Sequence, residues 1–324
     1  MYTMKKALKH KKFGSVLGWL FAFFAVVASF GIGNMTQANS ISSSIHETFG
    51  APTAVVGIVI TVLALLIIVG GIKTISKVSS VVVPLMAIFY VVAGLIVIIL
   101  NIQNVPSGMV LILKSAFNFR AVSGGVLGTI VASFANAMRY GVARGVFSNE
   151  AGMGSAPNAA ASADVSHPVK QGLVQMLSVF IDTLLVCTAT AMMCMCANPE
   201  GLVADAAGAA YVQQSMQLAL GDFGPIFIAV AMSLFAFTTL IGNYYYTEGC
   251  LKFILKRTPS KAFMLIFRLI ATALVFVGAL LSAGIVWDTA DMLQAFMVII
   301  NEGKDRVFKS SSIGLEGKTE CWED

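Results

Sequence analysis

The stretch Arg144-Gly-Val-Phe-Ser-Asn-Glu-Ala-Gly-Met-Gly-Ser155 decides the fold class of this chain, because it is polar and glycine-broken among apolar runs of membrane length. A bilayer core offers no water to an unpaired backbone group, so such a break is tolerated only against other protein or a polar cavity. Gly152, Gly154 and Pro157 oppose a continuous helix. The stretch therefore predicts an interrupted membrane helix, a feature that marks the binding sites of transporters.

The composition agrees with a membrane protein. Of the 324 residues, 57% are hydrophobic and 11% are charged, whereas a soluble domain carries roughly 25% charged residues. The mean hydropathy is +0.85. We expect an all-α polytopic membrane protein of about seven to eight transmembrane helices, each near the ~20 residues that a span needs. The candidate runs are Val16–Gly33, Ala54–Gly71, Ser80–Leu100, an interrupted stretch within Ala121–Ala163, Gly172–Cys196, Gly224–Tyr245, Ala262–Gly284 and the shorter Met292–Ile300.

The net charge of +5 follows membrane topology, so it does not indicate a nucleic-acid partner. The connections Gln37–Thr53 and Asn198–Phe223 contain no Lys or Arg, whereas the segment before the first run and Cys250–Lys261 are basic. Positive charge stays on the cytoplasmic side. We therefore predict a cytoplasmic amino terminus and a place in the cytoplasmic membrane. Asn101–Arg120 departs from this alternation and is predicted to be a short surface or re-entrant segment.

A cleaved signal peptide is the alternative interpretation of residues 1–33. It is disfavoured because the apolar run is long and passes into Gly31-Ile-Gly-Asn-Met-Thr-Gln-Ala-Asn-Ser40 without a clear processing site. From Asn301 the composition turns polar and unpatterned. We therefore predict a transmembrane domain over residues 1–300 and a disordered tail at Asn301–Asp324.

The cysteines and histidines do not form a pattern typical of a metal site or a catalytic site. Cys194 and Cys196 are spaced C-x-C, without the second ligand pair of a zinc site. The three histidines flank the apolar runs, and no nucleophile–base pair is evident. An enzyme is therefore not expected.

The broken stretch is the main candidate for a substrate site. A break frees backbone groups, and a half-helix start presents partial positive charge to an anion such as a carboxylate. The Asn149 amide adds donor and acceptor capacity. The alternative is a hydrophilic cytoplasmic connection in which Arg144 and Glu150 are solvated. Gln37 shares a helical face with Asn34 and could point into the bundle, or it belongs to an ordinary polar helix end.

Two further places could bind an ion. Thr238 and Thr239 lie inside an apolar run, where their hydroxyls could complete a sodium site, because hard cations prefer oxygen donors. Alternatively, they bond back to their own helix. Asp182 is a lone carboxylate within Gly172–Cys196, which makes it a functional candidate by default. Ion coupling and helix pairing through nearby threonines both remain open for it.

At these residues the chain resembles a known family. The stretch Arg144–Ser155 is similar to the signature of the alanine/glycine:cation symporters (sodium:alanine symporters). Gly31–Ser40, Asp182-Thr183 with Cys187-Thr188, and Phe235-Ala-Phe-Thr-Thr239 resemble other segments of that family in the same order. The resemblance covers about residues 1–300.

The resemblance implies a leucine-transporter-type bundle of two inverted repeats and sodium-coupled uptake of alanine or glycine. By motif, Asn149 would contact the substrate, with Ser148 and Glu150 shaping the break. Thr238 and Thr239 would form the hydroxyl side of a sodium site. Asn243 stands where many relatives have a tryptophan that lines the pocket. Together with the candidates drawn from the residues themselves, the substrate-binding candidates are Asn149, Ser148, Glu150, Gly152, Gln37 and Asn243. The ion-binding candidates are Thr238, Thr239 and Asp182, of which Thr238 and Thr239 are the candidates for sodium.

The resemblance also implies missing parts, because the family's first core helix, with its Gly-Thr-Gly-Asn break, and its second helix should precede this chain. We therefore expect a partial bundle. The expected function is sodium-coupled symport by alternating access, and the alternatives are an inactive truncated fragment or a channel-like pore. The sequence leaves the choice between sodium and proton coupling and the oligomeric state open.

Overall fold

The computed structural model describes residues 5, 11–116, 138–139, 141–150, 152–160, 163–197, 208–257 and 259–312. Every regular element within these ranges is a helix. Six of the described helices are long and apolar enough to cross a membrane, and Thr53–Val69 is a shorter apolar helix. The prediction of an all-α polytopic membrane protein is therefore confirmed.

The first half of the chain forms one long interrupted helix and a helical hairpin. Helices α2, η1 and α3 follow one another without a gap, and η1 between them is a π-helix. The bounds in this half are α2 Lys11–Ala28, η1 Ser29–Met35, α3 Thr36–Phe49, α4 Thr53–Val69, α5 Gly71–Leu100, η2 Ile102–Asn104 and α6 Val105–Ala116.

The second half contains another π-interrupted helix and three long helices. Residues 141–149 are helical, and η3 is a π-helix between α9 and α10. The bounds here are α8 Ala156–Ala160, α9 Pro168–Ile181, η3 Asp182–Cys187, α10 Thr188–Ala197, α11 Ala209–Leu220, α12 Phe223–Leu255, α13 Lys261–Leu280 and α14 Ala283–Ser312.

Local sequence sets several of the helix ends. Gly50 adopts φ 67° after α3 and its N–H bonds to the His46 carbonyl, a left-handed end that glycine allows without a steric cost. Ser260 begins α13 by accepting a hydrogen bond from the Phe263 N–H at 3.2 Å. Pro168 occupies the first turn of α9, where its missing N–H costs nothing.

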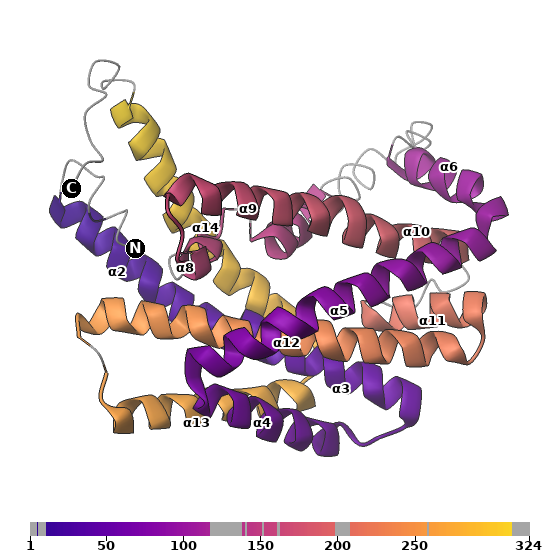
Figure 1. The fold of residues 1–324 in the computed structure, drawn as a ribbon, viewed down its shortest axis with the longest axis horizontal. Coiled ribbons are helices and arrows are strands. Elements are labelled where there is room, and N and C mark those ends of the chain that lie inside the picture. The colour runs from indigo at the N-terminus through magenta and orange to yellow at the C-terminus, as the bar shows by residue number, and fades with distance from the viewer. Residues whose placement is uncertain are drawn as a thin grey trace, which may run out of the picture.

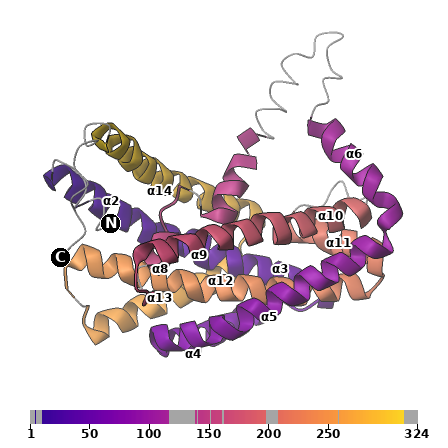
Figure 2. The ribbon, with the colours of Figure 1, turned by 45° about the horizontal axis from the view of Figure 1, so that its top comes forward.

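Helix α12 is the central element. It runs through the middle of the bundle, with α13 and α4 on one side and α9 and α10 on the other (Figures 1 and 2). It contacts α2, η1, α3, α5 and α11. Many large apolar side chains of α4, α5 and α9 are exposed, as expected for surfaces that face lipid.

Polar side chains hold α3 against α13. The Asn39 amide donates to the Leu281 carbonyl at 2.6 Å and to the Gly278 carbonyl at 3.2 Å, and Ser42 donates to the Ala279 carbonyl at 2.9 Å. Asn39 and Ser42 are buried, so the bonds supply partners that a bilayer would not.

The structure changes two of the expected boundaries, whereas Asn101–Arg120, predicted to be a short surface or re-entrant segment, contains α6, a helix too short to span. Most of the predicted external connection Gln37–Thr53 is helical, because α3 continues to Phe49. The last predicted run, Met292–Ile300, is part of the longer helix α14, which reaches Ser312.

Helix α14 therefore includes the first part of the segment predicted to be a disordered tail. The apolar run ends at Ile300, but the helix continues, because polar residues can also form a helix. Residues 313–324 lie outside the described ranges. So do 117–120 of the predicted surface segment, 121–137, 140, 151 and 161–162 of the predicted interrupted stretch, and 198–207 of a predicted external connection.

Candidate functional site

The helix of residues 141–149 breaks at the glycine-rich stretch, as predicted. Glu150, Gly152 and Gly154 adopt positive φ angles of 50°, 73° and 76°, and α8 begins only at Ala156. Such a conformation costs a non-glycine residue about 1–3 kcal/mol. The Ser155 hydroxyl donates to the Glu150 carboxylate at 2.9 Å, so the strained residue is tied across the break.

The break lies tightly against α14. The Asn301 amide donates to the Gly152 carbonyl at 2.9 Å. A Cβ at Gly154 would lie 2.8 Å from Asn301 Oδ1 and 3.1 Å from a ring carbon of Phe21. Glycine is therefore required at position 154 both by the backbone conformation and by the lack of space.

A cavity of about 310 Å³ lies beside the break. Its walls come from α2, η1, α3, the 141–155 segment, α8, α12 and α14, and they are mostly apolar. The polar residues that line it are Ser29, Gln37, Ser148, Glu150, Ser155, Asn158, Thr239, Asn243 and Tyr246. The volume is at the lower end of the range for small-molecule sites, about 300–1,000 Å³. The cavity therefore suits a small solute.

The cavity brings together five of the residues predicted from the sequence and leaves out the other four. Those that line it are Gln37, Ser148, Glu150, Thr239 and Asn243, whereas Asn149, Gly152, Asp182 and Thr238 do not.

Asn243 is held by a close helix contact. A Cβ at Gly33 would lie 2.0 Å from Asn243 Nδ2 and 2.6 Å from Asn243 Cβ. The Asn243 side chain therefore packs directly on the π-helix η1, in the space that glycine leaves open.

The two threonines of α12 behave differently. Thr238 is buried, and its hydroxyl donates to backbone carbonyls of its own helix at 2.9 and 3.0 Å, with Met86 sulfur 3.8 Å away. Thr239 also bonds back, to the Phe235 carbonyl at 3.0 Å, but it lines the cavity. Of the two threonines, only Thr239 lines the cavity and could contact a solute there.

A second polar cluster joins the end of the 141–149 helix to η3. Thr183 Oγ1 donates to Asn149 Oδ1 at 2.6 Å, and Ser148 Oγ donates to Asp182 Oδ2 at 2.9 Å. Cys187 Sγ lies 3.6 Å from Ser148 Oγ. Ser148 therefore belongs both to the cavity wall and to this cluster. We call Ser148, Asn149, Asp182 and Thr183 the acidic cluster.

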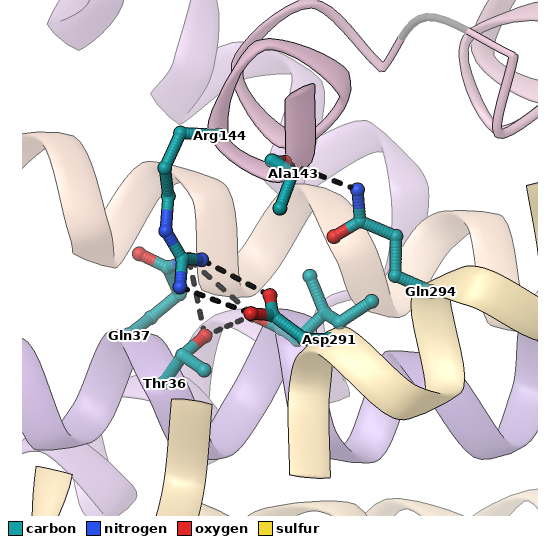
Figure 3. A network of polar contacts seen from close by, with 7 residues as sticks. Thr36, Gln37, Ala143, Arg144, Asp291 and Gln294 are labelled. Atoms are coloured by element: carbon teal, nitrogen blue, oxygen red, sulfur yellow. Dashed lines mark hydrogen bonds and ion pairs between the residues drawn. The ribbon is translucent and has the colours of Figure 1, made fainter. Parts of the chain in front are cut away.

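An ion pair that the sequence reasoning missed holds the 141–149 helix against α14. Arg144 Nη1 and Nη2 donate to the two carboxylate oxygens of Asp291, both at 3.1 Å (Figure 3). The guanidinium lies 4.3 Å from the centre of the Trp287 ring, and Phe147 of the cavity wall packs edge-on against that ring. The Gln294 amide adds a bond to the Ala143 carbonyl at 3.4 Å.

Comparison with known proteins agrees with the resemblance of the motifs. Residues 1–302 match the model of the sodium:alanine symporter family. The chain is 39% identical over 303 residues to the sodium/alanine symporter AgcS of Methanococcus maripaludis, an alignment that covers 93% of this chain and 64% of AgcS. It is 40% identical to the amino-acid carrier protein AlsT of Bacillus subtilis (94% and 69% covered).

A third relative is the sodium/proton-dependent alanine carrier protein of Bacillus sp. strain PS3, at 34% identity with 89% of this chain and 71% of the relative covered. This chain belongs to the sodium:alanine symporter family. The family is one of carriers rather than enzymes.

This sodium:alanine symporter family member spans 64% of the length of AgcS and 69% of the length of AlsT. The sequence predicts the break and several candidate residues of the site, which are Gln37, Ser148, Asn149, Glu150, Asp182, Thr239 and Asn243. Arg144 was predicted either to begin the motif or to be solvated in a cytoplasmic connection, and no signal linked it to Asp291, which is 147 positions away.

Proposed function

We propose that this chain takes part in sodium-coupled symport of a small neutral amino acid, alanine or glycine, across the cytoplasmic membrane. The observation that carries the proposal is the shared position of Ser148, which lines the cavity and also donates a hydrogen bond to Asp182. Family membership and the relatives named as alanine carriers support the same function.

The substrate would lie in the cavity beside the break. Its polar wall offers the amide N–H groups of Gln37 and Asn243, which can donate to a carboxylate, and the amide oxygens of the same two residues, which can accept from an ammonium group. The Ser148 hydroxyl could also donate to the substrate once a cation at Asp182 releases it from that carboxylate. The apolar remainder of the wall suits a short side chain. A larger substrate would need the cavity to expand.

The sodium ion would bind at the acidic cluster. Its donors are oxygen atoms of a carboxylate, an amide and two hydroxyls, which is the chemistry that hard cations prefer. A cation there would neutralise the Asp182 charge, which is costly inside a membrane. Thr239 on the cavity wall is a second candidate oxygen donor.

Coupling between substrate binding and sodium binding would follow from Ser148, which belongs to both the cavity and the acidic cluster. A cation on Asp182 would reorient the Ser148 hydroxyl, and that hydroxyl also contacts the cavity. Linkage then requires that substrate binding strengthens ion binding by the same factor. Alternating access would expose this joint site first to one side and then to the other.

The ion pair Arg144–Asp291 would close the site on one side. Asp291 lies in the amino-terminal third of α14 (Ala283–Ser312), at the end that the charge distribution predicts to be external. The pair joins the 141–149 helix to α14, and Phe147 connects it to the cavity wall. Opening toward the outside would therefore require this pair to separate.

The test uses the purified chain in two assays. In proteoliposomes, a sodium gradient should drive uptake of labelled alanine above its equilibrium level. In detergent, alanine should raise the midpoint of thermal unfolding more in sodium than in choline at equal ionic strength, because ligands that bind the folded state stabilise it.

Asp182→Asn should abolish the sodium dependence in both assays. Asp164→Asn is the matched control, since Asp164 is exposed and outside the site. A sodium-dependent stabilisation that survives Asp182→Asn would reject the ion site. Uptake that only equilibrates alanine would instead support a pore and reject symport.

A further inference from the structure

A second cavity lies at the end of the bundle that is predicted to be cytoplasmic. It has a volume of about 450 Å³ and lies between the beginning of α2 and the end of α12. Four of its lining residues are basic and none is acidic. The lining residues are Lys5, Ser15, Trp19, Lys252, Phe253, Lys256 and Arg257.

Most of this positive charge is uncompensated. Lys252 forms an ion pair with Glu248 at 2.8 Å. Within the described part of the chain, Lys5, Lys256 and Arg257 form no ion pair. Like charges that surround one cavity repel each other, and an anion in the cavity would relieve that repulsion. The cavity therefore favours a ligand with concentrated negative charge, such as a phosphate.

The neighbouring surface of α2 is apolar and exposed. Phe13, Val16, Trp19 and Phe23 are exposed by 54%, 57%, 44% and 43%. Their spacing of three or four positions places them on one face of the helix. Trp19 belongs both to this α2 face and to the cavity wall, and its ring stacks on Phe23 with centroids 5.6 Å apart. The basic cavity and the α2 face are therefore continuous.

We propose that this cavity binds the phosphodiester headgroup of an anionic phospholipid from the cytoplasmic leaflet, with an acyl chain lying along the α2 face. Basic pockets at the cytoplasmic ends of membrane helices suit such headgroups. Tryptophan belongs at the boundary between headgroups and acyl chains. A free phosphate ion would use the basic residues but not the α2 face, so the two sources of the same chemistry can be separated by experiment.

The test uses Trp19 as a reporter. The chain has three tryptophans, so the signal from position 19 is the difference in fluorescence between the natural chain and Trp19→Phe. The chain is reconstituted in phosphatidylcholine with increasing fractions of phosphatidylglycerol whose acyl chains carry bromine, a contact quencher. Brominated phosphatidylcholine is the lipid control.

Brominated phosphatidylglycerol should quench Trp19 at a lower mole fraction than brominated phosphatidylcholine does. Each basic residue near an anionic headgroup contributes about fivefold in affinity, so Lys256→Gln with Arg257→Gln should weaken the preference about 25-fold. Lys77→Gln with Lys261→Gln is the matched control, because both lysines are exposed, basic and outside the cavity.

Three results would overturn the proposal. The first is equal quenching by the two lipids in the natural chain. The second is an equal loss of the preference in the test and control pairs. The third is displacement of brominated phosphatidylglycerol by millimolar inorganic phosphate, which would assign the cavity to a free anion. The natural chain also gives a test without variants, since the preference for phosphatidylglycerol should fall as salt rises from about 0.05 M to about 0.5 M.

Discussion

The ion pair Arg144–Asp291 gives the sharpest quantitative prediction. Replacing Asp291 by Asn removes the negative charge but keeps the size of the side chain. Arg144 then loses the opposing charge and at least one of its two hydrogen bonds of 3.1 Å, because the amide nitrogen of Asn cannot accept a hydrogen bond, and it keeps its contact with Trp287. The change should therefore loosen the 141–149 helix from α14 without removing packing.

The magnitude follows from the partial burial of the pair. The side chain of Arg144 is 39% exposed and that of Asp291 is 23% exposed. Fully exposed pairs contribute about 0.2–1 kcal/mol, whereas breaking a fully buried pair costs about 3–5 kcal/mol. An intermediate pair with bidentate geometry should contribute about 2 kcal/mol, which corresponds to about a 30-fold change in an equilibrium constant.

The assay is a double-mutant cycle in which the free energy of unfolding is measured in mixed micelles titrated with a denaturing detergent. Arg144→Gln and Asp291→Asn are made singly and together, and their coupling should exceed about 1 kcal/mol. Asp288→Asn is the control, because Asp288 is exposed one turn away on the same helix. A coupling below about 0.3 kcal/mol, or an equal effect of Asp288→Asn, would refute the reasoning.

Two close backbone contacts give further predictions. Gly278→Ala should destabilise the bundle by about 1–3 kcal/mol, because its Cβ would lie 2.4 Å from the Met35 Cα, whereas Gly284→Ala, with nothing within 4 Å, should not. Detergent unfolding measures both, and equal stabilities would contradict the close packing of η1 on α13. Gly33→Ala should also destabilise by about 1–3 kcal/mol and weaken alanine binding, because it pushes Asn243 out of place in the cavity wall. Asn243→Ala in the same chain should restore part of that stability, and no recovery would argue against the contact.

The approximate positions of the long apolar helices could be predicted from the sequence for a clear physical reason. A membrane-spanning segment must satisfy its backbone hydrogen bonds within a helix and expose apolar side chains to lipid. The hydropathy and length of a run therefore indicate a spanning helix directly. The break was predictable because Gly152 and Gly154 are poor helix formers that allow positive φ. The end of α14 was not predictable in the same way. Hydropathy indicates which residues lie in the apolar part of the membrane but does not indicate where a helix ends. The polar residues after Ile300 continue α14 as far as Ser312.

The arrangement of the site was harder to predict, because it depends on helix rotation. Neighbouring positions on an α-helix point about 100° apart. Ser148 therefore faces the cavity, while the adjacent Asn149 does not line it and instead accepts a hydrogen bond from Thr183. A motif names both residues but does not fix their directions. The Arg144–Asp291 pair depends in addition on how two distant helices pack.

Irregular backbone occurs in the cavity wall and in the acidic cluster next to it, and this distribution has a physical cause. Three of the described helices lose their regular α-form: at η1, which contains Gly33, at the break after Asn149, and at η3, whose Asp182 accepts a hydrogen bond from the cavity residue Ser148. Each irregularity frees or shifts backbone groups that lipid cannot satisfy. A bundle in a membrane can hold them only where polar side chains or an enclosed solute supply partners. The structure provides such partners around Ser148, which touches both the cavity and Asp182. A substitution that removes polar side chains from this region should therefore disturb all three helices together, whereas a substitution at a lipid-facing helix surface should not.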